Sequence, residues 1–190
     1  IVGGPMLTFK NETLFGRASG YALTSFFGVG TVYPRYKRYN ETKNATEVML
    51  TSANLICRRK VLEKVSFDEN LWPGEDVKFI SDALSAGFKV GYSPKIYVYQ
   101  ERRQNYMQLF KQMFRYGYAR TKKENISTTI KRTPYFLVPS LFILYLLSVP
   151  LLTPDFLFRI PLFLYLILNL GISLFLGFTK KDFYSVLLLP

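Results

Sequence analysis

The sequence contains no histidine and only one cysteine, Cys57, among its 190 residues. A single cysteine excludes a disulfide within the chain and any metal cluster held by several cysteines. Without histidine, a reaction that moves a proton near neutral pH would use a carboxylate as its base. Acidic residues are also few, since 13 Asp and Glu stand against 25 Lys and Arg, for a formal net charge of +12. The chain therefore offers few candidates for general acid and base catalysis.

The excess of positive charge indicates a negatively charged partner. No basic segment matches a nucleic-acid-binding motif, so we predict no nucleic-acid partner. Beside a membrane, the same charge would attract anionic headgroups, at about 1 kcal/mol for each well-placed Lys or Arg. The charge therefore favours membrane lipids as a partner.

Two long apolar runs lie in the C-terminal part of the chain. Residues 134–152 carry no charge, and residues 156–178 carry only Arg159. Each run is long enough to cross a hydrocarbon core of about 30 Å as a helix. Basic residues lie mainly before the first run, are missing between the runs, and return as Lys180 and Lys181. The positive-inside rule then predicts an integral membrane protein whose N-terminal part is cytosolic. Two buried helices of a soluble protein are the alternative, but so short a chain has little left to bury them.

The ends of the sequence carry a further expectation. Residues 183–190 begin a third apolar run that is too short to span a membrane. The sequence also starts at Ile1, without a methionine. We therefore expect the natural chain to extend in both directions.

Upstream of the apolar runs, helix and strand patterns alternate, which favours a mixed α/β layer architecture. The apolar periodicity predicts helices at residues 13–27, 59–65, 76–86 and 104–120, and strands at 48–53, 89–92 and 96–99. Val2-Gly3-Gly4-Pro5 predicts a turn. Residues 33–47 are polar, basic and rich in Tyr and Asn, and we expect a mobile loop there.

Two adjacent carboxylates, Glu75 and Asp76, stand at the start of the helix predicted at 76–86. A carboxylate within hydrogen-bond reach can take the proton from an attacking hydroxyl. Gly74 permits a sharp turn before them, and Trp72 offers a flat face for a sugar ring. The alternative is an ordinary helix start, with Asp76 as N-cap, because acidic residues are common in a first turn.

The helix predicted at 104–120 has two different faces. Tyr106, Phe110 and Met113 gather with Phe114 and Gly117 on one side, whereas Gln112, Arg115 and Tyr116 are spaced i, i+3 and i+4 on the opposite side. Such a helix fits a membrane interface, with the apolar side toward the lipid. Arg suits a diphosphate because its planar donors bind two oxygens at once. A basic amphipathic anchor without a substrate role remains the alternative.

The order and spacing of several short motifs resemble the C-terminal half of a family 2 glycosyltransferase with the GT-A fold. The likeness is to membrane-attached polysaccharide enzymes of the succinoglycan and cellulose-synthase-like type. The motifs that carry it are Val2–Pro5, Arg58–Leu62 before Phe67–Glu69, Gly74–Asp76, Ala86–Val90, Ser93-Pro94 and Phe110–Tyr118. The resemblance implies that residues 1–100 form half of the catalytic domain, 101–133 an interface helix and basic linker, and 134–190 a transmembrane region.

The resemblance also implies roles for individual residues. Asp76 matches the general base of this family, and Glu75 is its neighbour in the motif. Gln112, Arg115 and Tyr116 match a Gln-x-x-Arg-Trp pattern at the acceptor and diphosphate site, with Tyr in place of Trp. Trp72 would stack on sugar.

Two features of the family are missing from this sequence. The Asp-x-Asp motif, which holds a divalent cation (Mg²⁺ or Mn²⁺) and the donor diphosphate, is absent, so the metal ligands would lie outside this chain. Many relatives also have a His where Gln100 stands.

These expectations combine into one functional prediction. The chain would belong to an inverting, hexosyltransferase-like enzyme that moves a sugar from a nucleotide-diphosphate donor to a lipid-linked or polysaccharide hydroxyl. The segment by itself would be inactive, because half of the donor site is missing. The alternative is a non-catalytic basic module that anchors a partner or binds anionic lipid. A small transporter is disfavoured because Arg159 is the one charge within the two runs.

Overall fold

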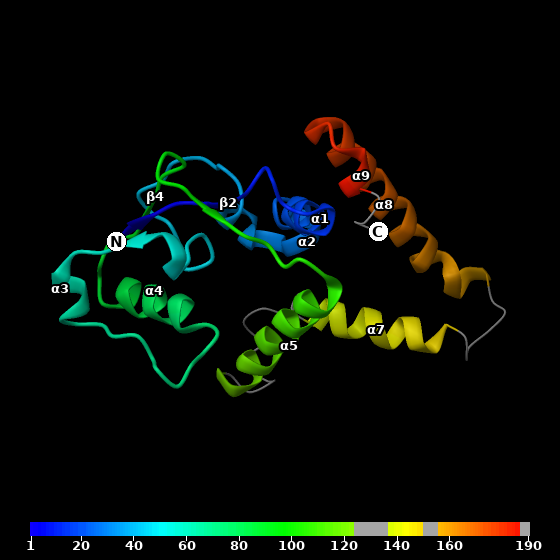
Figure 1. Cartoon of the computed structure of the whole chain (residues 1–190). Helices are drawn as coiled ribbons and strands as arrows, with labels where there is room; N and C mark the ends of the chain where they lie inside the picture. Colours follow the sequence, from blue (N-terminus) through cyan, green and yellow to red (C-terminus); the bar gives the residue numbers. More distant parts are fainter. Residues whose placement is uncertain (124–136, 150–155, 187–190) are drawn as a thin grey trace. The chain divides into compact units, whose positions relative to one another are not determined.

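The computed structural model describes residues 1–123, 137–149 and 156–186. The chain divides into two compact units, residues 1–119 and residues 120–190, and the boundary falls within helix α5 (Tyr106–Lys123). Figure 1 shows the order of the elements along the chain.

Unit 1 contains two small sheets. Strand β1 (Val2–Gly3) lies between β3 (Leu55–Ile56) and β4 (Gly91–Tyr92), antiparallel to the first and parallel to the second. Strands β2 (Met6–Thr8) and β5 (Val98–Gln100) form a parallel pair in which Leu7 lies opposite Tyr99. The architecture is mixed α/β, as the alternating patterns predicted. The turn predicted at residues 2–5 is wrong for Val2 and Gly3, because they form the central strand.

Close backbone approach explains the two glycines there. A Cβ on Gly3 would lie 2.3 Å from the carbonyl oxygen of Asn54, and one on Gly4 would lie 1.8 Å from that of Ile96. Neither position has room for a side chain. The Gly-Gly pair therefore permits the chain to pass between two other backbone segments. Because Gly-Gly is also common in turns, the sequence pattern predicted a turn here.

The helices of unit 1 partly follow the predicted boundaries. The helix predicted at 13–27 is two helices, α1 (Leu14–Leu23) and α2 (Phe26–Val29), because the Ser25 hydroxyl accepts a bond from the Phe27 N–H and starts a second helix. The strand predicted at 48–53 is wrong, since this stretch forms a turn and the beginning of a short 3₁₀ helix, η2 (Ser52–Asn54). Helix α3 (Arg59–Leu62) is shorter than predicted.

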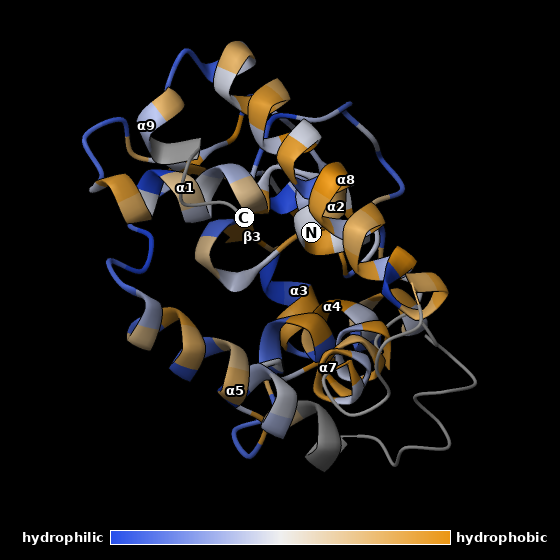
Figure 2. Ribbon diagram, turned by 90° about the vertical axis from the view of Figure 1, so that its right-hand side faces the viewer, coloured by the Kyte–Doolittle hydropathy of each residue, from blue (hydrophilic) through white to orange (hydrophobic). Residues whose placement is uncertain are grey.

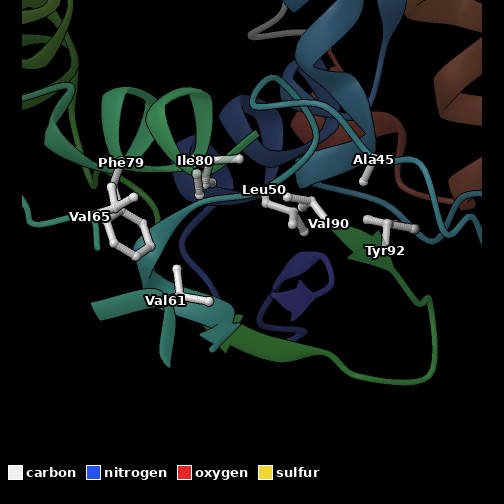
Figure 3. Close-up of a cluster of buried hydrophobic side chains, with 9 residues drawn as sticks. Ala45, Leu50, Val61, Val65, Phe79, Ile80, Val90 and Tyr92 are labelled. Carbon is white, nitrogen blue, oxygen red and sulfur yellow. The ribbon is translucent and has the colours of Figure 1, made fainter. Parts of the chain in front are cut away.

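Helix α4 (Glu75–Ser85) supplies much of the core of unit 1. Figure 3 shows Phe79 and Ile80 of this helix pointing toward a cluster with side chains from several other segments. Phe79, Ile80 and Ala83 are fully buried. Burying a side chain such as Phe or Ile contributes about 1.5–3 kcal/mol. The members of the cluster are Ala45, Leu50, Val61, Val65, Phe79, Ile80, Ala83, Val90 and Tyr92.

The segment expected to be a mobile loop is irregular but firmly attached. Its start belongs to a 3₁₀ helix, η1 (Gly30–Arg35). The Arg35 guanidinium then donates to the carbonyl oxygens of Glu47, at 2.6 Å, and Val48, at 2.7 Å. The buried Tyr92 hydroxyl lies 2.9 Å from the carbonyl oxygen of Lys37 and donates toward it. The expectation of a mobile loop did not include the contact with Tyr92, which lies 55 residues after Lys37 in the sequence.

Unit 2 contains the apolar helices α7 (Val138–Ser148) and α8 (Phe156–Lys180), followed by α9 (Phe183–Val186). Among the described residues, α8 is the one helix long and apolar enough to cross a membrane, with a mean hydropathy of 2.1. Figure 2 shows α7 and α8 as mainly hydrophobic ribbons. The Tyr145 hydroxyl of α7 donates to the carbonyl oxygen of Phe158 of α8, at 2.8 Å. Both ends of the run predicted at 134–152, and the last four residues of the run at 183–190, lie outside the described residues.

Candidate functional site

The start of α4 presents the two predicted carboxylates. Gly74 precedes the helix with φ of +119°, in the left-handed region that favours glycine. Glu75 and Asp76 then occupy the first turn, where the helix dipole stabilises negative charge. Asp76 is therefore inside the helix, and the residue at the N-cap is Gly74 instead of the Asp76 that we expected.

The two carboxylates differ in what they bind. An oxygen of Glu75 accepts a hydrogen bond from the neighbouring Gly74 N–H at 2.9 Å. Asp76 accepts from the Val77 N–H at 2.8 Å through one oxygen and from the Ser52 N–H at 3.3 Å through the other. The second bond reaches 24 residues back along the chain. Asp76 thus connects α4 to η2, whereas the bond that Glu75 accepts is local.

Helix α5 carries the predicted polar triad, and the helical spacing is confirmed. The Gln112 side-chain amide donates to the Tyr116 hydroxyl at 2.9 Å, as an i, i+4 pair should. The Gln112 carbonyl oxygen accepts from the Arg103 guanidinium at 3.0 Å. Gln112 is therefore held by two side chains, Arg103 before it and Tyr116 after it in the sequence.

The structure brings the two motifs together. The guanidinium carbon of Arg115 lies 5.6 Å from the centre of the Trp72 ring, within the range of a cation–π contact. Trp72 is 68% exposed, so its ring faces solvent beyond this contact. Arg115 and Tyr116 are also exposed. The loop before α4 and the polar side of α5 thus form one surface, which we call the α4–α5 surface.

Tyr36 directly follows η1 and is partly buried. Burial raises the pKa of its phenol, Arg35 and Arg102 oppose this rise, and Tyr116 and Asp76 add to it. The Arg102 guanidinium lies 5.2 Å from the centre of the Tyr36 ring. Sequence reasoning missed both Tyr36 and Arg102. Tyr36 stands in a segment rich in tyrosine, and no local pattern distinguishes it from its neighbours.

Arg102 is 7% exposed and is held by a network of polar groups. Its guanidinium donates to the Met6 carbonyl oxygen at 2.6 Å, the Thr8 hydroxyl at 3.0 Å and the Gln100 side chain at 3.1 Å. Its backbone N–H donates to the Glu12 carboxylate at 2.7 Å. Burial lowers the pKa of Arg102, but the guanidinium remains charged at neutral pH. Gln100 is thus a partner of a buried cation.

The described residues do not form a metal site. No three of their His, Cys, Asp and Glu side chains gather as metal ligands. The Asp76 carboxylate is directed at two backbone N–H groups.

A separate hollow of about 730 Å³ lies elsewhere on unit 1. It is lined by Lys64–Asn70 together with Lys78, Asp82 and Ala86. None of the predicted site residues lines it. Its mixture of positive and negative side chains does not select one ligand, so we assign it no role.

Comparison with known proteins gives one match. A family model described as "Glycosyl transferase family group 2" matches residues 16–179, which includes the α4–α5 surface and α7. No curated protein and no solved structure matched the chain. The family match covers most of the sequence and includes both motifs that the structure joins, so this chain belongs to glycosyl transferase family group 2.

Proposed function

We propose that the chain carries the acceptor side of an inverting, hexosyltransferase-like glycosyltransferase that works at the cytosolic face of a membrane. Its donor would be a nucleotide-diphosphate sugar, and its acceptor a hydroxyl of a lipid-linked or growing glycan. The observation that carries the proposal is the contact between Arg115 and Trp72, because it joins the carboxylate loop to the polar side of α5.

The proposed reaction is a single displacement. Asp76 takes the proton from the acceptor hydroxyl while that oxygen forms a bond to the anomeric carbon of the donor sugar. The bond between this carbon and the diphosphate oxygen breaks on the opposite side, and the diphosphate leaves with the electron pair. Attack from the opposite side inverts the configuration of the anomeric carbon.

Asp76 is better suited than Glu75 to act as the base. The bond from the Ser52 N–H to Asp76 is long, at 3.3 Å, so this carboxylate oxygen can exchange it for an acceptor hydroxyl. The Glu75 carboxylate instead accepts a shorter bond, at 2.9 Å, from the residue beside it. We assign Glu75 to holding the loop before α4 in place.

The polar side of α5 fits the remaining roles. Arg115 is exposed, and its planar donors would bind the leaving diphosphate together with Gln112. The Trp72 and Tyr116 rings would stack on sugar. A divalent cation, Mg²⁺ or Mn²⁺, also belongs to the proposal, bound by residues outside this chain. For this reason we expect residues 1–190 alone to be inactive.

Two features support a membrane location. The apolar side of α5 is exposed, with Phe110 and Phe114 each about two-thirds accessible, which suits a helix lying in the interface. Helix α8 is long and apolar enough to span. The basic residues upstream favour the cytosolic side for unit 1. A polysaccharide-forming enzyme of the succinoglycan or cellulose-synthase-like type fits this combination.

The test is Asp76→Asn in the full-length protein, screened against UDP-glucose, UDP-galactose, UDP-N-acetylglucosamine and GDP-mannose. Loss of the base should lower transfer about 10²- to 10⁴-fold while leaving donor binding largely intact. Asp82→Asn is the matched control, because Asp82 lies on the same helix and makes only a half-exposed i, i+4 pair with Lys78. Near-normal turnover by Asp76→Asn would overturn the assignment. If the unaltered protein turns over no nucleotide sugar but binds anionic vesicles, a non-catalytic membrane module becomes the better description.

A further inference from the structure

Arg103 stands just before α5, between two residues that are tied to the body of unit 1. One oxygen of the Glu12 carboxylate accepts from the Arg102 backbone N–H at 2.7 Å, and the other accepts from the Gln104 side-chain amide at 2.8 Å. Glu12 is only 7% exposed, and the Thr13 hydroxyl donates to the Gln104 side-chain oxygen at 2.7 Å. Arg103 itself is exposed. Its backbone is therefore held in place while its side chain faces solvent.

The Arg103 side chain reaches the polar side of α5. Its Nε–H donates to the Gln112 side-chain oxygen at 3.0 Å, and Arg115 follows Gln112 by three residues, on the same side of the helix. A guanidinium has five N–H donors, and this bond uses one of them. Within the described part of the chain, neither Arg103 nor Arg115 pairs with a carboxylate. Two positive charges thus flank Gln112, and no acidic side chain neutralises them.

This arrangement fits a ligand with several negative charges. Two nearby guanidinium groups repel each other, and an anion bound between them removes the repulsion. Their planar donors match the oxygens of a phosphate, two at a time. Gln112 has less to offer, because its carbonyl oxygen already accepts from Arg103 and its amide already donates to Tyr116. The second set of charged donors on this surface therefore comes from Arg103.

We propose that Arg103 is a second diphosphate-binding residue, whose terminal N–H groups bind the phosphate from which the sugar leaves. When the bond between the anomeric carbon and the diphosphate oxygen breaks, the electron pair stays on that oxygen. Arg103 and Arg115 then stabilise the new charge together. The inference rests on the proposed function and adds a residue to the same site. The Gln-x-x-Arg pattern does not include Arg103, which stands nine residues before Gln112.

The experiment titrates UDP and GDP, each compared with UMP and GMP, into the full-length protein in phosphatidylcholine nanodiscs with Mg²⁺. These lipids carry no net charge, so no anionic headgroup competes for Arg103. Arg103→Gln should weaken binding of the nucleoside diphosphate about 10- to 100-fold, the loss of charged hydrogen bonds, and leave the affinity for the monophosphate unchanged. Arg103→Lys, which keeps the charge but not the planar donors, should show a smaller loss. Arg59→Gln is the matched control, because Arg59 is an exposed residue of α3 that pairs with Glu63.

A second background separates direct binding from support of Gln112. If Arg103 binds phosphate itself, Arg103→Gln should still weaken diphosphate binding several-fold in a Gln112→Ala protein. No further loss in that background would show that Arg103 acts only through Gln112, and would overturn the proposal. An equal loss of monophosphate and diphosphate binding would show a general effect and also overturn it.

The remaining outcomes keep this inference apart from the proposed function. Normal diphosphate affinity in Arg103→Gln, while Asp76→Asn is inactive in transfer, overturns the role of Arg103 and leaves the function standing. If the unaltered protein binds neither UDP nor GDP and turns over no nucleotide sugar, the proposed function fails, and this inference fails with it.

Discussion

Tyr92 joins two distant segments of unit 1 through a single hydroxyl. It belongs to a two-residue strand, yet its O–H is directed to the carbonyl oxygens of Pro34 and Lys37 and accepts from the Tyr39 N–H. Removing the hydroxyl would leave these buried polar groups without their partner, which costs about 1–3 kcal/mol. The residue thus fixes the backbone on both sides of Tyr36.

Tyr92→Phe should therefore destabilise unit 1 by about 1–3 kcal/mol near neutral pH. Burial raises the pKa of Tyr92 above its ordinary value of 10.0, against a smaller lowering by the Tyr39 N–H. Above pH 10 the unfolded chain loses this proton before the folded unit does, so the free energy of unfolding falls as pH rises. Chemical denaturation followed by the fluorescence of the single tryptophan would show both effects. The fall above pH 10 should be smaller in Tyr92→Phe, and an equal fall would contradict this account.

At the scale of the element, a glycine at each end determines where α4 begins and where it ends. Gly74 begins it and Gly87 ends it, and both adopt positive φ. After the helix, the Gly87 N–H bonds the Leu84 carbonyl at 3.0 Å and the Phe88 N–H bonds the Ala83 carbonyl at 3.0 Å, which is a Schellman motif. The two ends fix the register in which Asp76 faces the site while Phe79 and Ile80 face the core.

Gly87→Ala should destabilise unit 1 by about 1–2 kcal/mol, the cost of a left-handed conformation for a residue with a Cβ. Open space surrounds this position, so the effect comes from the backbone and not from a clash. Gly117→Ala is the control, because its Cβ would also meet nothing but the residue lies within α5. There the same substitution should stabilise the helix by about 0.5–1 kcal/mol. Denaturation midpoints that move in the same direction for both variants would contradict the assignment.

Elements differed in how well the sequence predicted them. The helices α4 and α5 lie within three residues of the predicted boundaries, since apolar residues at helical spacing and a terminal glycine are local signals. The strands are only two or three residues long, and they are defined by partners elsewhere in the chain. This is why the central strand β1 resembled a turn, and why the strand expected at 48–53 is formed at Leu55–Ile56 instead.

For the whole molecule, the charge and the apolar helices decide how the chain would meet a membrane. If α8 crosses the bilayer, its two ends lie on opposite sides. In a Cys57→Ser background, Phe156→Cys should react with a membrane-impermeant maleimide added to intact cells, whereas Lys180→Cys should react only after permeabilisation. Both positions are exposed ends of α8. Equal labelling of the two in intact cells would show that α8 does not span.

The sequence by itself determined the helices α4 and α5, the apolar segments, the carboxylate pair and the polar triad on α5. These are local features, because each depends on residues within one or two turns of a helix. The tertiary structure alone decided that Trp72 meets Arg115, and that the Tyr36 ring meets the Arg102 guanidinium. Those contacts join residues 40 or more positions apart, and only packing and backbone hydrogen bonds between distant segments can bring them together.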